Sequence, residues 1–190
     1  DPDIARLALA HTLQAINAAK ALDARFLILP SGYSPLAAAE GHLKPWLSRL
    51  TAVLEELVFG HIEGYSLILL VENCLDPAPD FMETLFSRID SPQLQAALNT
   101  GYANVFSDVP IIDWVDRLGA RLGYVAASNN DGRQHSRSPL EEGGIDFSSI
   151  LNHLVLRPNR MQLCLEGAGP QAVRDSLPFL QPFLLQQEET

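Results

Sequence analysis

The sequence predicts an α/β fold in which parallel βα units form part of a (βα)8 barrel, with about five of the eight strands present. Apolar runs that lack internal alternation are separated by amphipathic segments, which is typical of parallel strands covered by helices. The runs begin near residues 26, 66, 94, 122 and 161, at intervals of about 28 to 40 residues that suit one βα unit each. An open doubly wound sheet is the alternative, but no Gly-x-Gly-x-x-Gly or Walker loop follows any run, so the barrel is favoured.

The first half of the chain contains two predicted helix–strand pairs and a third helix. Residues 3–22 carry apolar side chains at nearly the 3.6-residue period of a helix. The run Phe26–Leu29 is apolar throughout and precedes Pro30-Ser31-Gly32, which predicts a buried strand and then a loop. The same order continues with a helix over 43–59, a strand over 65–71, and a helix over 80–89 for which Asp80 is the expected N-cap.

The second half repeats the pattern to the end of the chain. Its predicted elements are, in order, a strand over 94–98, a helix over 110–118, a strand over 122–126, a polar loop over 128–144, a helix over 145–154, a strand over 161–165 and a helix over 172–180. We therefore expect one barrel domain over residues 1–181, incomplete at its N-terminus, followed by a polar tail over 182–190.

Composition and charge exclude several classes of protein. Asp and Glu outnumber Lys and Arg by 23 to 13, and the basic residues are scattered, so nucleic acid is not an expected partner. The longest apolar run is far shorter than the roughly 20 residues of a membrane-spanning helix, so no membrane partner is expected either. Cys74 and Cys164 are too few for a disulfide framework and are predicted to be reduced thiols. A cytoplasmic protein is the resulting prediction.

Two carboxylates, Glu72 and Glu166, stand where predicted strands end. In barrels and open parallel sheets alike, ligands bind at the carboxyl ends of the strands. Partial burial at such a place raises the pKa of a carboxyl group toward the range used in general acid–base catalysis. The alternative is that each glutamate only pairs with a neighbouring side chain or main-chain donor.

Five segments, in order along the chain, resemble one known family. They read LILLVENC, LNTGYAN, YVAASNNDG, SPLEEGGIDF and LCLEG. Their order and spacing are similar to the second half of the xylose isomerase-like barrels, a superfamily of sugar isomerases, epimerases and endonuclease IV. The resemblance covers most of residues 1–170. It implies a TIM barrel that the chain enters at the third helix, and hence an N-terminally truncated member.

The same resemblance implies a metal site, from which this sequence departs. The family holds a divalent metal with Glu, Asp, His and Glu from four strand ends, which correspond here to Glu72, Asn99, Ala126 and Glu166. Further ligand positions of the family correspond to Leu29 and Tyr102, and the family's Asp-x-His pair falls near His135 and Arg137. We therefore expect a degenerate metal site and no cofactor, the alternative being a weak divalent metal at Glu72 and Glu166.

Two functions are consistent with these observations, and the sequence leaves open whether the chain is an enzyme. The first is an isomerase or epimerase in which Glu72 and Glu166 move a proton next to the carbonyl of a small sugar or keto acid. Protein groups would polarise that carbonyl, and the expected substrate-binding residues are Asn73, Asn99, Tyr102, Asn129, His135 and Arg137. The second is a catalytically inactive barrel relative that binds a small polyol or a protein partner.

A barrel remnant of five strands has two open edges. A closed barrel has none, and an exposed strand edge is a site for pairing with another chain. If the chain is complete, we expect it to cover these edges by forming an oligomer.

Overall fold

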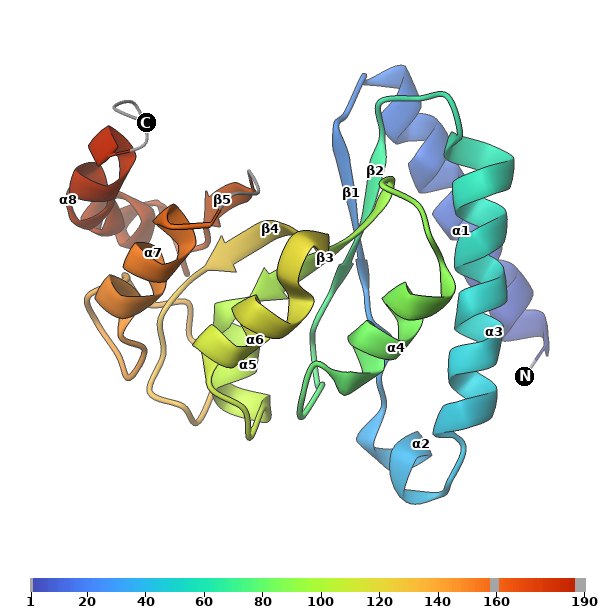
Figure 1. Ribbon diagram of the computed structural model, residues 1–190, viewed down its shortest axis with the longest axis horizontal. Coiled ribbons are helices and arrows are strands. Elements are labelled where there is room, and N and C mark those ends of the chain that lie inside the picture. The colour runs from blue at the N-terminus through green and yellow to red at the C-terminus, as the bar shows by residue number, and fades with distance from the viewer. Residues whose placement is uncertain (1, 158–160, 187–190) are drawn as a thin grey trace.

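The computed structural model describes residues 2–157 and 161–186, and its centre is one sheet of parallel strands (Figure 1). The strands are β1 (Phe26–Pro30), β2 (Ile68–Glu72), β3 (Leu94–Asn99), β4 (Leu122–Ala127) and β5 (Gln162–Leu165). They lie in the order β1-β2-β3-β4-β5, each parallel to its neighbour, and Figure 1 shows them turning progressively from β1 to β5. The predicted fold class is confirmed: the chain forms a half-barrel of βα units.

Helices cover the outer side of this sheet (Figure 1). They are α1 (Pro2–Ala21), α2 (Pro35–Ala39), α3 (Leu43–Glu55), η1 (Glu56–Ile62), α4 (Asp80–Arg88), α5 (Thr100–Phe106), α6 (Ile111–Leu118), η2 (Gly119–Arg121), α7 (Phe147–Val155) and α8 (Pro170–Gln186). Among the described residues, none of the helices combines the length and the apolar character needed to cross a membrane.

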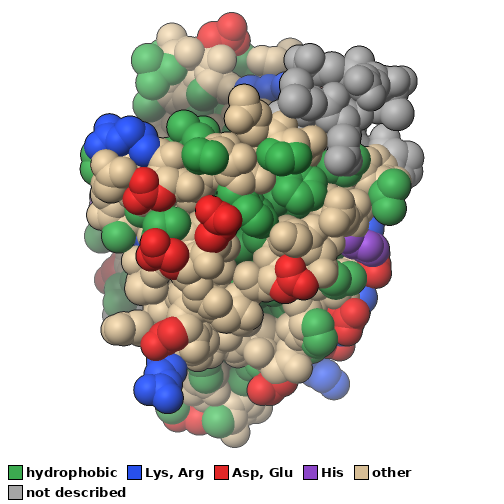
Figure 2. All heavy atoms as spheres, turned by 90° about the vertical axis from the view of Figure 1, so that its left-hand side faces the viewer, with side chains coloured by type: hydrophobic (Ala, Val, Ile, Leu, Met, Phe, Trp, Pro, Cys, Tyr) green, Lys and Arg blue, Asp and Glu red, His purple; other side chains and the backbone are tan. Residues whose placement is uncertain are grey.

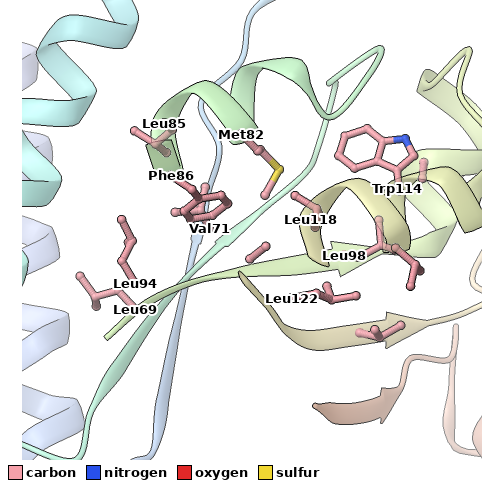
Figure 3. Packing of buried hydrophobic residues seen from close by; sticks show 14 of the residues in the cluster. Leu69, Val71, Met82, Leu85, Phe86, Leu94, Leu98, Trp114, Leu118 and Leu122 are labelled. Atoms are coloured by element: carbon pink, nitrogen blue, oxygen red, sulfur yellow. The ribbon is translucent and has the colours of Figure 1, made fainter. Parts of the chain in front are cut away.

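The main hydrophobic core lies between the outer face of the sheet and the helices. Figure 3 shows the contact made by α4 and α6 with side chains of β2, β3 and β4. Trp114 of α6 is fully buried there, and its indole Nε1 donates a hydrogen bond to Ser107 Oγ at 2.8 Å. Because the indole N–H is satisfied, this large side chain stabilises the core without a buried polar cost. The core fixes the sheet, and therefore the positions of the residues at the strand ends.

The inner face of the sheet is less completely covered. Leu70, Ala97 and Ala126 are buried on adjacent strands, yet they lie outside the main core cluster. The rings of Phe26 on β1 and Tyr124 on β4 pack edge to face, with centroids 6.2 Å apart. Strands β1 and β5 each have one neighbouring strand among the described residues, so both edges of the half-barrel are unpaired there.

The strand expected over 65–71 begins only at Ile68. The side-chain amide of Gln93 donates to the carbonyl oxygens of Ile62, Tyr65 and Leu67 at 2.8–3.0 Å. These bonds satisfy the main chain in a loop conformation, so the apolar character of this stretch does not extend the strand.

Two helix starts and ends also differ from the sequence pattern. The helix expected over 43–59 is α-helical to Glu55 and continues as the π-helical η1 to Ile62, whose side chain is buried. Asp80 is not the N-cap of α4 but its first residue, and Pro79 takes the cap position. The Asp80 carboxylate lies 3.1 Å from the guanidinium of Arg117 on α6, so it forms an ion pair between two helices.

The sequence pattern missed α2 and α5 and placed α8 too narrowly. Helix α5 starts at Thr100, directly after β3, in a stretch whose Asn and Gly residues are typical of a loop. Helix α8 continues through two internal prolines to Gln186, five residues into the predicted polar tail over 182–190. Residues 187–190 lie outside the described residues.

Figure 2 shows the side of the molecule that carries α7 and α8. Acidic side chains are spread over this face, basic ones lie apart from one another near its margin, and hydrophobic ones gather near its middle. This distribution agrees with the net charge of -10 and contains no basic stripe for a phosphate backbone. The two cysteines are unpaired, and burial raises the pKa of the Cys74 thiol to about 11, so this thiol is protonated at neutral pH.

Candidate functional site

The structure brings Glu72, Glu166 and Asn99 together at the carboxyl ends of β2, β5 and β3. The side-chain amide nitrogen of Asn99 lies 3.1 Å from Glu166 Oε2 and 3.4 Å from Glu72 Oε1. One amide group therefore donates to both carboxylates. The two glutamates predicted from sequence face the same point, although two other strands separate their own strands in the sheet.

The Asn99 amide is held in one orientation. Its Oδ1 accepts a hydrogen bond from the main-chain N–H of Tyr102 at 3.1 Å, which makes Asn99 the N-cap of α5. Because the oxygen is used by the helix, the NH2 group points toward the glutamates. The main chain of Asn99 is fixed in turn by Asn73, whose Oδ1 accepts from the Asn99 N–H at 2.6 Å and whose Nδ2 donates to the Asn99 carbonyl at 3.1 Å.

The two carboxylates have different surroundings. Burial raises the pKa of Glu72 above its usual value, and the negative charge of Glu166 raises it further, while the Asn99 hydrogen bond and the Arg137 charge oppose the rise. Glu166 has more donors close by: its Oε2 lies 3.8 Å from Arg137 Nε and 3.9 Å from His135 Nε2. The pair therefore combines one carboxyl group that is biased toward its protonated form with one that lies beside a cation.

His135 lies against the ring of Tyr102. The two rings are stacked with centroids 4.1 Å apart, and the His135 side chain is only 11% exposed. Its Nε2 is buried without a hydrogen-bond partner among the described residues. Burial and the charge of Arg137 both lower the pKa of His135, with Glu166 opposing them, so the neutral imidazole is favoured. A neutral ring with a free nitrogen is available to donate to, or accept from, a bound molecule.

Arg137 reaches the site from the loop between β4 and α7. Its main chain has a φ of 54°, a left-handed conformation that a non-glycine residue adopts rarely. The Arg137 carbonyl accepts a hydrogen bond from the Ala168 N–H at 2.9 Å, which ties the loop to the segment after β5. Its side chain is 46% exposed and its guanidinium makes no hydrogen bond within the described part of the chain. The cation is therefore open to solvent and to a ligand.

Two predicted substrate-binding residues have structural partners instead of facing the glutamates. Asn73 uses both side-chain polar atoms on the main chain of Asn99. Asn129 donates to the carbonyl oxygens of Leu140 and Ile145, and its Oδ1 accepts from the N–H groups of Asn130 and Ile145. Both side chains are about 1% exposed. Their hydrogen bonds hold the main chain and the loop around the site. That Asn73 or Asn129 contacts a substrate stays a prediction.

Sequence reasoning missed Gly101 and Ser128. A Cβ atom on Gly101 would lie 2.4 Å from His135 Cδ2, 2.5 Å from His135 Nε2 and 2.9 Å from Ser128 Oγ, so only glycine fits beneath the His135 ring. Ser128 is fully buried and its Oγ has no partner among the described residues. The signal that could have found both residues is their place just after a strand end, Gly101 after β3 and Ser128 after β4.

Two hollows of the surface lie away from the glutamates. The larger, of about 440 Å³, lies between α5, α6 and α7, and the smaller, of about 290 Å³, lies between α1 and α3. Neither is lined by any of the predicted site residues. The candidate site is instead the open mouth of the half-barrel, where the polar side chains converge.

Comparison with known families agrees with this architecture. A family profile described as Xylose isomerase-like TIM barrel matches residues 1–183. The chain belongs to the xylose isomerase-like TIM barrel family. No curated protein sequence matches this xylose isomerase-like barrel.

Solved structures similar to this xylose isomerase-like barrel include three described as sugar epimerases or epimerase-like. A D-tagatose 3-epimerase-like protein has a TM-score of 0.84 and 22% identity, with 100% of this chain and 73% of that chain covered. The D-allulose 3-epimerase from Methylomonas sp., in complex with D-allulose, has a TM-score of 0.76 and 16% identity, covering 96% and 70%. An L-ribulose 3-epimerase has a TM-score of 0.74 and 14% identity, covering 100% and 71%. At these identities the likeness is one of fold.

The residues of this xylose isomerase-like barrel do not fit the divalent metal that its family implies. Asn99 turns N–H donors, not an oxygen, toward Glu72 and Glu166. Ala126, which pairs with Asn99 in the strand register, offers no donor atom at all. Within residues 2–157 and 161–186, no three His, Cys, Asp or Glu side chains are grouped closely enough to hold a metal ion. Between the two carboxylates the site thus presents amide N–H donors where a metal ion would need further oxygen or nitrogen ligands.

Proposed function

We propose that the protein is a sugar isomerase- or epimerase-like protein that moves a proton at the carbon next to a carbonyl of a small sugar or keto acid. The observation that carries the proposal is the single Asn99 amide that holds Glu72 and Glu166 at one point of the barrel mouth. Removal and return of a proton at one carbon requires an acid and a base on the same substrate, and two carboxylates in unlike surroundings supply them.

In this proposal Glu166 is the base and Glu72 the acid. Glu166 lies beside the Arg137 guanidinium and takes the proton from carbon. Glu72, whose pKa is raised by burial, holds the proton that it returns to the enediolate. The Arg137 guanidinium, together with His135 where its partnerless Nε2 carries the ring proton, stabilises the oxygen that becomes negative.

The structural neighbours support a sugar as the substrate class. Their names describe enzymes or enzyme-like proteins of tagatose, allulose and ribulose, and all match this chain over at least 96% of its length. The free guanidinium of Arg137 supports a keto acid as the other member of the class, because guanidinium and carboxylate groups form paired hydrogen bonds.

The test is exchange of the substrate C–H proton with deuterium from solvent, followed by NMR on ketoses and on hydroxypyruvate. We expect the wild type to convert the substrate into its epimer or isomer with deuterium at the reacting carbon, and we expect both Glu72→Gln and Glu166→Gln to lose this conversion, because each variant removes one member of the acid–base pair. Glu141→Gln, on the exposed loop before α7, is the matched control and keeps the wild-type rate. Full conversion of the substrate by either glutamine variant at the site contradicts the two-carboxylate mechanism.

The second candidate function is binding without turnover, of a small polyol or a protein partner. It is favoured by Asn99 and Ala126, which stand at two strand ends where the family resemblance implies metal ligands. It predicts no exchange with any ketose or keto acid, together with saturable polyol binding that Glu166→Gln weakens. Exchange above the rate of a heat-denatured sample rejects it.

We propose further that the protein acts in the cytoplasm as an oligomer if this chain is complete. The two unpaired cysteines are typical of a reducing compartment. The outer edges of β1 and β5, which have no strand partner within the described part of the chain, support the oligomer, since such edges pair readily with another chain. Light scattering coupled to size exclusion measures the mass directly, and a well-behaved monomer contradicts the oligomer.

A further inference from the structure

Protein hydrogen-bond donors lie between Glu72 and Glu166, at the place where a cation would lie in a metal site. Two carboxylates that converge on one point repel each other unless positive charge or N–H groups lie between them. Here the group between them is the Asn99 NH2, at 3.1 and 3.4 Å from the two carboxylates. The amide cannot turn over to present its oxygen, because that oxygen caps α5 through the Tyr102 N–H.

The positive charge comes from Arg137. Of the polar groups near the pair, Asn99 is already bonded to both carboxylates and Asn129 is bonded to loop main chain on both ends. His135 Nε2 is buried without a hydrogen-bond partner among the described residues and lies 3.9 Å from Glu166 Oε2, beyond hydrogen-bond distance. Arg137 remains, with its Nε at 3.8 Å from Glu166 Oε2 and its guanidinium without a hydrogen-bond acceptor within residues 2–157 and 161–186.

We infer that Asn99 and Arg137 together take the place of a divalent metal: the Asn99 amide positions the two glutamates, and the Arg137 guanidinium supplies the charge. Asn99 is thus a positioning residue. The inference concerns the glutamate pair of the proposed function. The experiment below measures cation binding, which does not depend on turnover. The exchange of the metal for Asn99 and Arg137 can therefore be refuted while the proposed proton transfer stands, and the reverse also holds.

The inference is tested by rebuilding the cation site. Ala126 lies between Asn99 and Cys164 in the strand register, so a histidine there places a nitrogen beside the carboxylates. We expect the wild type to bind Mn²⁺ only in the millimolar range or more weakly, and Asn99→Asp/Ala126→His to bind one Mn²⁺ per chain in the micromolar range. Electron paramagnetic resonance of free Mn²⁺ and isothermal titration calorimetry measure both.

Two further variants guard against failed folding and against a simple charge effect. Asn99→Asp alone creates three carboxylates around one point, so Mn²⁺ should raise its melting temperature while leaving that of the wild type unchanged. Asn152→Asp, on the exposed side of α7, adds the same charge away from the site and should not respond to Mn²⁺. Circular dichroism verifies that each variant is folded.

The role of Arg137 is tested by measuring Mn²⁺ affinity in the Asn99→Asp/Ala126→His variant. Removing its charge with Arg137→Gln should tighten Mn²⁺ binding by on the order of tenfold, because a nearby cation opposes a second one, whereas Arg137→Lys should leave the affinity unchanged. Micromolar Mn²⁺ binding by the wild type overturns the inference. A folded Asn99→Asp/Ala126→His variant that does not bind Mn²⁺ also overturns it. If Arg137→Gln leaves the Mn²⁺ affinity of that variant unchanged, Arg137 does not supply the charge.

Discussion

Replacing Asn73 with alanine should destabilise the fold strongly, although Asn73 was expected from sequence to bind substrate. Its side chain makes two hydrogen bonds to the main chain of Asn99, at 2.6 and 3.1 Å, and both residues are about 1% exposed. The variant leaves a buried N–H and a buried carbonyl without these partners, at about 1–3 kcal/mol for each group. We therefore expect a loss of about 2–5 kcal/mol in the free energy of unfolding, or about 5–15 °C in Tm for a chain of this size.

Urea unfolding followed by circular dichroism measures the loss. Asn152→Ala, which removes the same side chain from the exposed side of α7, is the control and should stay within about 0.5 kcal/mol of the wild type. An Asn73→Ala protein that is as stable as this control refutes the argument. If that protein also binds ligand more weakly, Asn73 is a binding residue after all.

Two other predictions follow from the site. Gly101→Ala places a Cβ within 2.5 Å of the His135 ring, so we expect the ring to leave its stack on Tyr102 and the free energy of unfolding to fall by about 1–3 kcal/mol. Urea unfolding and the NMR signals of His135 measure these two effects. Gly169→Ala, where a Cβ meets no neighbouring atom, is the control. Glu72→Gln should gain stability relative to the wild type as pH rises above 4.5, the ordinary pKa of a glutamate, because the pKa of Glu72 is raised in the folded state and its ionisation then costs stability. Melting temperatures across that range decide it: a difference that is constant with pH contradicts the burial argument.

The five strands were predictable because each is a short apolar run, and helices separate the runs at the length of a βα unit. The start of β2 shows the limit of this signal. Residues 65–67 adjoin the apolar run of β2, but the Gln93 side chain, distant in sequence, donates hydrogen bonds to the carbonyl oxygens of Tyr65 and Leu67 and holds them in a loop. Helix α5 was missed for a related reason. Its N-cap, Asn99, is also the last residue of β3, and no loop separates the two elements.

At the site, the sequence placed Glu72 and Glu166 correctly at strand ends but could not place the groups between and around them. That Asn99 bonds both carboxylates depends on α5 fixing its amide, which is a tertiary effect. Asn129 was grouped with the site because it follows β4, yet its side chain turns into the loop and bonds the main chain there. The position of a polar residue after a strand makes it a candidate site residue. Its hydrogen bonds in the folded protein decide whether it faces the site or holds the loop.

Each departure from the family pattern removes a metal ligand or adds a hydrogen-bond donor or a positive charge. This affects the choice between an active and an inactive protein. Asn99 puts a donor where the resemblance implies an acceptor, Ala126 removes a ligand, and Arg137 brings a cation to 3.8 Å from Glu166. Loss of function alone gives no reason for replacements that offset one another while the acid pair stays aligned on one amide. Donors arranged around two carboxylates stabilise a negative oxygen that forms during proton transfer, as a metal would. We therefore propose that the protein retains proton-transfer chemistry, and the deuterium experiment on Glu72→Gln and Glu166→Gln decides between this and a passive binding role.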